Sequence, residues 1–127
     1  MPIQIYALLT WTTRDRAPVI GPEVEEFLGR ALPAIARRHG AHVIELGVVP
    51  DHVHVLLSLP TKIDFPTLVQ SLKGATARIA NRDGIARGER LRWATGYDLR
   101  TVSPGRALAR VKQYVAAQKE HHGVKGQ

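Results

Sequence analysis

The centre of the chain carries the pattern that most restricts its fold. Two runs rich in strand-forming residues, 42–49 and 52–59, are separated only by Pro50 and Asp51, a pair typical of tight turns. So short a connection forces the two runs to pair antiparallel, because parallel neighbours need a crossover of about a dozen residues or more. The sequence therefore predicts a β-hairpin in the middle of the chain.

Two further strands are expected outside the hairpin. Residues 3–13 are apolar and rich in strand formers, while residues 91–102 show a weaker, broken strand pattern. With three helical segments between and after these strands, the order of elements is β-α-β-β-α-β-α. Four strands with helices packed on one face make an α+β fold, with an antiparallel sheet of the ferredoxin or RNA-recognition-motif type. No repeat or linker divides residues 1–127, so a single domain is expected.

Apolar residues at helical spacing predict the three helices. The first begins at Pro22 and ends near Gly40, and Pro33 within it should kink or interrupt it, because proline lacks an N–H and its ring clashes with the preceding turn. Asp64 is placed to cap the second helix, and the third begins after Pro104.

The charge of the chain favours a polyanionic partner. The formal net charge is +7, and 13 of the 18 basic residues are arginines, whose planar guanidinium matches phosphate oxygens. A GC-rich genome also favours arginine codons, so the charge indicates nucleic acid without proving it.

Composition also limits the chemistry and the location of the chain. There is no cysteine, so disulfides and thiolate zinc sites are excluded, and any metal must be held by histidine, carboxylate or amide groups. The first residues lack the basic region of a signal peptide, and no apolar run approaches the roughly 20 residues that span a bilayer. We therefore expect a cytoplasmic protein with no membrane segment.

The second run of the hairpin opens with Asp51-His52-Val53-His54. Residues two apart in a strand share a face, so both histidines project side by side while Val53 faces the core. Two neutral imidazoles at that spacing can hold one divalent cation, and Asp51 can orient His52 through a hydrogen bond. Two ordinary surface histidines beside a turn aspartate would show the same pattern.

The last predicted helix carries Tyr114 and Gln118, which lie four residues apart and therefore on one face. They border the apolar stripe of that helix, which consists of Leu108, Val111 and Val115. A deprotonated tyrosine is a nucleophile toward phosphorus. A tyrosine that keeps its hydroxyl at the edge of the core, beside a solvated glutamine, fits the same spacing.

Taken together, the two motifs point to phosphodiester chemistry. The oxygens of a phosphodiester repel a nucleophile, and a metal bound to a non-bridging oxygen offsets that charge. A tyrosine that attacks phosphorus keeps the bond energy in a phosphotyrosine link, so rejoining needs no external energy source. Two histidines and a glutamine would give three neutral metal ligands and leave positions open for phosphate and water.

Five segments, in the same order, resemble a known family. The family is that of the single-tyrosine HUH transposases (TnpA proteins) of the insertion-sequence 200/605 group, and the resemblance runs from about residue 5 to residue 122. The similar segments are TWTTRDRAPVI, VVPDHVHVLLSLP, SLKGATARI, RWATGYDLRTVS and VKQYVAAQKEHH. The second segment is similar to the family's metal motif and the last to its nucleophile helix.

The resemblance implies a role for each candidate residue. His52, His54 and Gln118 would bind a divalent metal ion, Mg²⁺ or Mn²⁺. Tyr114 would become joined to a DNA 5′ phosphate, and the cut would leave a free 3′-OH. Family members are dimers that act on single-stranded DNA and recognise imperfect hairpins at element ends. The resemblance therefore implies a homodimeric DNA transposase that cleaves and rejoins single-stranded hairpin DNA at the ends of an insertion element.

Basic residues outside these motifs are candidates for DNA contacts. Arg87, Arg90 and Arg92 lie in a loop with two glycines, and a basic loop can follow a nucleic-acid backbone. Lys73 on the second predicted helix can also contact phosphates, although a solvated helix face explains it equally well.

Two other functions fit parts of the sequence. A domesticated HUH nuclease acting on palindromic repeats dispersed in a genome would keep the same residues, but the compact length favours a transposase. A catalytically inactive nucleic-acid-binding module on a similar sheet would need exposed strand aromatics, and aromatic residues make up only 6% of the chain. Such a module would also have no need of the histidine pair or of the tyrosine–glutamine pair.

Overall fold

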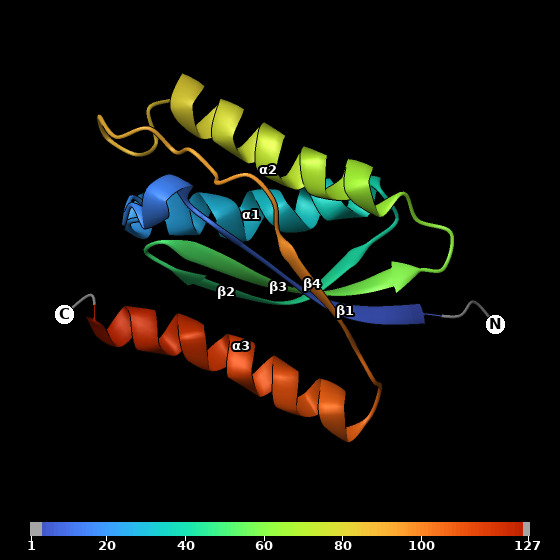
Figure 1. Ribbon diagram of the computed structural model, residues 1–127. Helices are drawn as coiled ribbons and strands as arrows, with labels where there is room; N and C mark the ends of the chain where they lie inside the picture. The colour runs from blue at the N-terminus through green and yellow to red at the C-terminus, as the bar shows by residue number, and fades with distance from the viewer. Residues whose placement is uncertain (1–3, 126–127) are drawn as a thin grey trace.

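A four-stranded antiparallel sheet forms the centre of the protein (Figure 1). The structure is a computed structural model that describes residues 4–125, with side chains described up to Gln118. The strand order is β2-β3-β1-β4, with β2 and β4 at the edges. The strands are β1 (Gln4–Thr12), β2 (His42–Val49), β3 (His52–Pro60) and β4 (Asp98–Val102). The predicted hairpin is the β2–β3 pair, and the predicted α+β class is confirmed.

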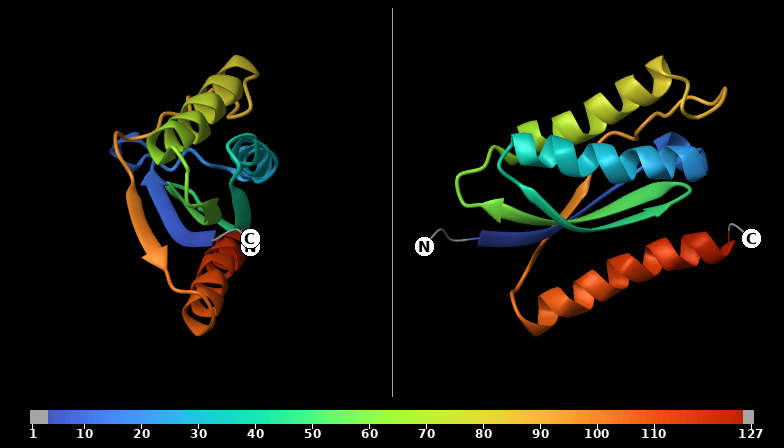
Figure 2. Two further views of the ribbon diagram at one scale, coloured as in Figure 1. Left: turned by 90° about the vertical axis from the view of Figure 1, so that its right-hand side faces the viewer. Right: turned by 180° about the vertical axis from the view of Figure 1, so that it is seen from behind.

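Helices cover both faces of this sheet (Figures 1 and 2). The helices are α1 (Pro22–Arg38), α2 (Phe65–Arg82) and α3 (Arg106–Lys125), with a short 3-10 turn, η1 (Arg14–Arg16), after β1. The expected arrangement on one face describes α1 and α2, whereas α3 crosses the opposite face. Because α1 and α2 already cover the first face, the turn after the edge strand β4 leads α3 to the other one. No helix within residues 4–125 is long and apolar enough to cross a membrane.

Alternation along β3 divides its side chains between the two faces. Val53, Val55 and Leu57 belong to the main apolar core under α1 and α2. His54 and Leu56 are also buried but lie outside that core, because they point to the face that α3 crosses. β3 thus has one face in the main core and a second face, which carries the histidines, under α3.

Helix α1 continues through Pro33, so the predicted interruption is wrong. A proline inside a helix costs about 3 kcal/mol, through one missing hydrogen bond and a steric clash. Leu28 and Leu32 before the proline and Ile35 after it are all buried against the sheet and α2. Burial on both sides of Pro33 therefore holds the two halves of the helix in line.

Asp64 caps α2 as predicted: its carboxylate accepts hydrogen bonds from the Thr67 backbone N–H at 3.2 Å and from the Thr67 hydroxyl at 2.7 Å. These bonds hold the pKa of Asp64 below its ordinary value of 3.8. A carboxyl with a lowered folded pKa stabilises the fold above its unfolded pKa, and this stability is lost as pH falls through the folded pKa.

We therefore expect Asp64→Ala to lower the melting temperature at pH 7, by an amount that shrinks below about pH 4, where the unfolded carboxyl begins to titrate. Thermal melts followed by circular dichroism at pH 7 and pH 3 measure the difference in melting temperature between the variant and wild type. Asp64→Asn is the matched control, because asparagine caps a helix about as well as aspartate. A deficit of equal size at pH 7 and pH 3 would contradict the role of the charged cap.

Candidate active site

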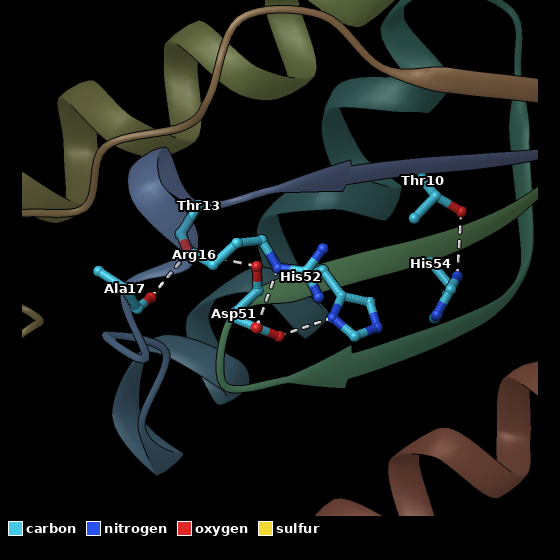
Figure 3. A network of polar contacts seen from close by, with 7 residues as sticks. All are labelled: Thr10, Thr13, Arg16, Ala17, Asp51, His52 and His54. Atoms are coloured by element: carbon cyan, nitrogen blue, oxygen red, sulfur yellow. Dashed lines mark hydrogen bonds and ion pairs between the residues drawn. The ribbon is translucent and has the colours of Figure 1, made fainter.

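His52 and His54 lie side by side on the face of β3 that α3 crosses (Figure 3). Their ring centroids are 4.8 Å apart and their planes meet at 89°. His54 is only 8% exposed, whereas His52 is partly exposed. The H-x-H spacing therefore brings two imidazoles together, one of them shielded from solvent.

A chain of polar contacts holds the ring of His52. Its Nδ1 donates to Asp51 Oδ1 at 2.7 Å, and Asp51 Oδ2 accepts from Arg16 Nε at 3.1 Å. Burial raises the pKa of Asp51, but the hydrogen bonds from His52 and Arg16 outweigh it and leave that pKa below its ordinary value. Asp51 is therefore ionised at neutral pH and acts as the acceptor, so the proton of neutral His52 sits on Nδ1 and the Nε2 lone pair is free.

His54 is held in the same way by a neighbouring strand. Its Nδ1 lies 3.0 Å from the hydroxyl of Thr10 on β1, while its Nε2 is buried with no hydrogen-bond partner. Burial, and then the nearby charge of His52, lower the pKa of His54 to about 4. The ring is therefore neutral at physiological pH, and when Nδ1 donates to Thr10 the lone pair of Nε2 is available.

The donor set fits a divalent cation. Both rings are held through Nδ1, and when each Nδ1 donates, two Nε2 lone pairs lie on one face of the sheet. Buried nitrogens without partners, such as His54 Nε2, are uncommon outside functional sites. Among the residues that the structure describes, no group of three histidine, cysteine or acidic side chains is placed to hold a metal. Within the part of the chain whose side chains are described, a third protein ligand beside this pair would therefore be of another residue type.

Tyr114 and Gln118 lie on the helix that crosses this face. The Tyr114 ring is centred 5.6 Å from the His54 ring, at 71°, and its side chain is 51% exposed. Gln118, one turn further on, has its Cβ close to Gly47, and Gly47 is paired with His54 across the β2–β3 ladder. The structure thus brings the tyrosine–glutamine pair of one motif against the histidine pair of the other.

Two of the basic candidates already have partners in the structure. Lys73 Nζ donates to the carbonyl oxygens of Ala94 and Gly96, each at 2.7 Å, and burial lowers the pKa of Lys73. Lys73 therefore ties the segment before β4 to α2. Arg87 forms an exposed ion pair with Glu23 at 3.3 Å.

Arg90 and Arg92 lie in a different setting. With Arg14, they line a cleft of about 370 Å³ that also contains Asp15 and Glu89. None of these three arginines forms an ion pair among the described residues. Arg14 and Asp15 of the cleft belong to η1, which also supplies Arg16, the arginine that bonds Asp51.

Three residues of this site were not predicted from the sequence. Thr10 bonds to His54 and Arg16 bonds to Asp51, and both bonds join segments that lie far apart in the sequence. No local sequence pattern predicts such contacts. Gly47 did leave a signal, since an isolated glycine within a strand pattern often marks a close approach of another backbone. Its position beside α3 shows that this signal was informative.

Known proteins are similar to this chain in sequence. The model of the IS200-like transposase family matches residues 3–118. The ISDra2 transposase TnpA of Deinococcus radiodurans is 35% identical over 114 residues, which make up 87% of this chain and 81% of that protein.

Solved structures give the same result for the fold. A crystal structure of a Deinococcus radiodurans protein described as a transposase superposes with a TM-score of 0.73 at 31% identity and covers 93% of each chain. A REP-associated tyrosine transposase bound to a REP hairpin gives a TM-score of 0.71 at 17% identity, over 97% of this chain and 72% of that one, and so is similar in fold. Because the family model and a relative above 30% identity both span most of its length, the chain belongs to the IS200-like transposase family.

Proposed function

We propose that this transposase cleaves and rejoins single-stranded DNA at the ends of an insertion element, through a covalent link between Tyr114 and a 5′ phosphate. The observation that carries the proposal is the Tyr114 ring, half exposed and 5.6 Å from the ring of His54, whose Nε2 is buried and unpaired. A nucleophile that substrate can reach thus lies against a nitrogen that is free to bind a cation.

His52, His54 and Gln118 would hold the divalent ion, Mg²⁺ or Mn²⁺. The ion would offset the charge on a non-bridging oxygen of the scissile phosphate. Asp51 and Thr10 would hold the two imidazoles in the orientation and tautomer that this requires. Gln118 is the proposed third ligand because its amide oxygen is neutral and its Cβ lies beside the strand position that faces His54.

Tyr114 would carry out the covalent step. Its hydroxyl loses a proton and the oxygen attacks phosphorus, while the bond from phosphorus to the 3′ oxygen breaks and that oxygen leaves as a free 3′-OH. Attack by a different 3′-OH on the phosphotyrosine reverses the step and joins two DNA ends. No external energy source is needed, because one phosphodiester is exchanged for another.

The arginine cleft is the proposed path of the DNA backbone next to the site. Arg90 and Arg92 have no carboxylate partner there, so their guanidinium groups can bind phosphates without first breaking an ion pair. Arg87 would contribute by exchanging its exposed pair with Glu23, which is worth about 1 kcal/mol or less. Lys73 would contribute a phosphate contact only through the N–H that its two carbonyl bonds leave free.

The alternatives are less well supported. The similarity to a REP-associated transposase keeps a domesticated nuclease acting on dispersed palindromes as the second candidate, yet the transposases of Deinococcus radiodurans are nearly twice as identical to this chain. An inactive nucleic-acid-binding module would use the open face of such a sheet. Here α3 crosses that face, and His54 is buried on it.

We also infer that the working form is a homodimer. The outer edge of β4 is unpaired within the described residues, and Leu99 on that strand is 40% exposed. The turn before α3 contains Gly105 with a φ of +83°, a conformation open to glycine, where the direction of the helix can change. α3 could therefore serve its own sheet or that of a partner.

Cleavage should require both the metal and the tyrosine hydroxyl. We expect Mg²⁺- or Mn²⁺-dependent cutting of single-stranded hairpin DNA and a covalent protein–DNA adduct on denaturing gels. EDTA should stop the reaction, and added metal should restore it. Tyr114→Phe should bind the hairpin as before but form no adduct, because only the hydroxyl is lost. An adduct in Tyr114→Phe, or cleavage undiminished by EDTA, would refute the assignment.

The support from Asp51 can be measured without DNA. We expect Asp51→Ala to weaken Mn²⁺ binding by about 10–100-fold, the usual effect of removing a partner that orients a ligating histidine. Isothermal titration calorimetry measures the affinity. Asp83→Ala is a matched control, since Asp83 is also paired with an adjacent residue, Arg82, but lies at the end of α2. Equal affinity in Asp51→Ala and wild type would rule out this orienting role.

The arginine cleft predicts a salt dependence. With about five phosphate contacts at about −0.7 each, the log–log slope of single-strand binding against salt should be roughly −3 to −4. Arg90→Ala and Arg92→Ala should each reduce the magnitude of that slope by about 0.7. Arg30→Ala, which removes an exposed arginine of α1 paired with Glu26, should leave the slope unchanged. Fluorescence anisotropy at several salt concentrations measures the affinity for single-stranded DNA. An affinity that does not change with salt would show that the arginine cleft does not bind DNA phosphates.

Subunit mixing tests whether α3 can work against a partner. Tyr114→Phe and the double variant His52→Ala/His54→Ala are each expected to be inactive. A heterodimer with catalysis in trans combines one intact tyrosine with one intact histidine pair, so the mixture should recover part of the adduct formation. Catalysis in cis needs both elements in one chain, and neither variant has them. A mixture that stays inactive although heterodimers form would exclude the trans arrangement.

A further inference from the structure

Gly47 marks the closest approach of α3 to the sheet. A Cβ built on Gly47 would lie 2.6 Å from the backbone oxygen of Val115, 3.2 Å from Val115 Cγ1 and 3.3 Å from Gln118 Cβ. Real Cβ atoms essentially never come within 3.0 Å of another heavy atom outside their own chain neighbours. Any side chain at position 47 would therefore push α3 away from the strand.

The backbone of Gly47 gives no other reason for a glycine. Its φ lies outside the left-handed region, unlike those of Gly40 and Gly105 in the turns. It occupies an ordinary position in the β2–β3 ladder, opposite His54. Glycine inside a strand weakens it, because glycine has more backbone freedom to lose and no side chain to pack. The close approach of α3 is thus the feature that explains this residue.

The contact is flanked by the candidate catalytic groups. On the sheet, Gly47 is the cross-strand neighbour of His54. On the helix, it meets Val115, which follows Tyr114, and Gln118 one turn later. Val115 is fully buried, and it is the one buried side chain among residues 106–118 of α3. Within residues 106–118, this is therefore the point at which the helix is buried most deeply against the sheet.

We propose that Gly47 is a positioning residue: it forms a notch that receives Val115 and so sets how closely Tyr114 and Gln118 approach the histidine pair. The docking itself follows from the packing, while its catalytic consequence rests on the proposed function. Because the notch lies on the strand beside the histidines, it must receive whichever α3 is working there, whether from the same chain or from a partner.

The docking can be tested without metal or DNA. In wild type, the Tyr114 ring lies against the His54 ring, so its ring current shifts the His54 ring-proton signals in NMR spectra. Tyr114→Ala gives the signals of His54 without that ring. We expect Gly47→Ala to move the His54 signals toward those of Tyr114→Ala. Gly29→Ala in α1 is the matched control, because a Cβ there meets nothing within 4 Å, and its spectrum should match wild type.

Catalysis provides a second, separate readout. In Gly47→Ala the carbonyl of Val115 must withdraw from 2.6 Å to beyond 3.0 Å, and ordinary contact begins only at 3.4 Å. A misplacement of about 1 Å can cost roughly 100-fold in rate, so adduct formation should fall by about 100-fold while hairpin binding is retained. Val115→Ala alters the same contact from the helix side, by removing the side chain that enters the notch. It should therefore also lower the rate of adduct formation. This second variant decides the matter if Gly47→Ala does not fold.

Subunit mixing adds a test in which the same substitutions are redistributed. The Tyr114→Phe chain carries the intact histidine pair. If Gly47→Ala is added to that chain, the notch beside this pair is blocked, and the recovery of adduct formation in the mixture should disappear. If it is placed on the His52→Ala/His54→Ala chain, the intact pair keeps an open notch, and recovery should persist. Equal recovery in both mixtures would overturn the proposal.

The NMR signals and the adduct rate together distinguish an error in the role of Gly47 from an error in the proposed function. Wild-type His54 signals in Gly47→Ala, or an adduct rate within about threefold of wild type, would overturn the positioning role, since that role predicts roughly 100-fold. If the wild-type protein forms no adduct on Tyr114, the proposed function fails, and the NMR comparison still decides whether Gly47 seats α3.

Discussion

The register between β1 and β3 is the constraint on which the candidate site depends. It sets Thr10 opposite His54, so the hydroxyl that fixes this imidazole comes from the neighbouring strand. Because side chains alternate along a strand, a slip of one residue would turn both histidines toward α1 and α2. Val53, Val55 and Leu57 prevent that slip, since each would lose its place in the main core. The core face of β3 therefore orients the other face, where the chemistry is proposed.

β3 also contains a buried polar atom that lowers the stability of the fold. His54 Nε2 is buried without a partner, and leaving a buried polar atom unsatisfied costs about 1–3 kcal/mol. The surrounding residues satisfy Nδ1 of both rings and leave Nε2 of His54 unpaired. An apolar residue at position 54 would avoid the cost. Conflicts of this kind between local burial and polar satisfaction are expected where a protein binds a ligand or does chemistry.

Local patterns in the sequence predicted most of the fold but less of the site. The hairpin, the faces of His52 and His54, and the Asp64 cap depend on neighbours within a few residues, and the structure contains all three. The position of α3 on the opposite face and the bond from Thr10 to His54 depend on how distant segments meet. Periodicity fixes which side of an element is apolar, but it does not fix the register or the layer in which that element packs.

In the proposed reaction, the contact between α3 and the sheet must satisfy two opposing requirements. In-line attack on phosphorus needs the reacting atoms held at about 3–3.5 Å, which favours a rigid helix. In the proposed dimer, exchange of DNA ends between two sites would need that helix to leave one sheet and reach another, which would favour weak attachment. Among the α3 side chains that the structure describes, Val115 is the one that is buried, and the glycine notch that receives it sets the depth of the contact. A glycine that fixes the depth of contact would let a helix that leaves the sheet return to the same position, and so would reconcile exchange with accuracy in the proposed reaction.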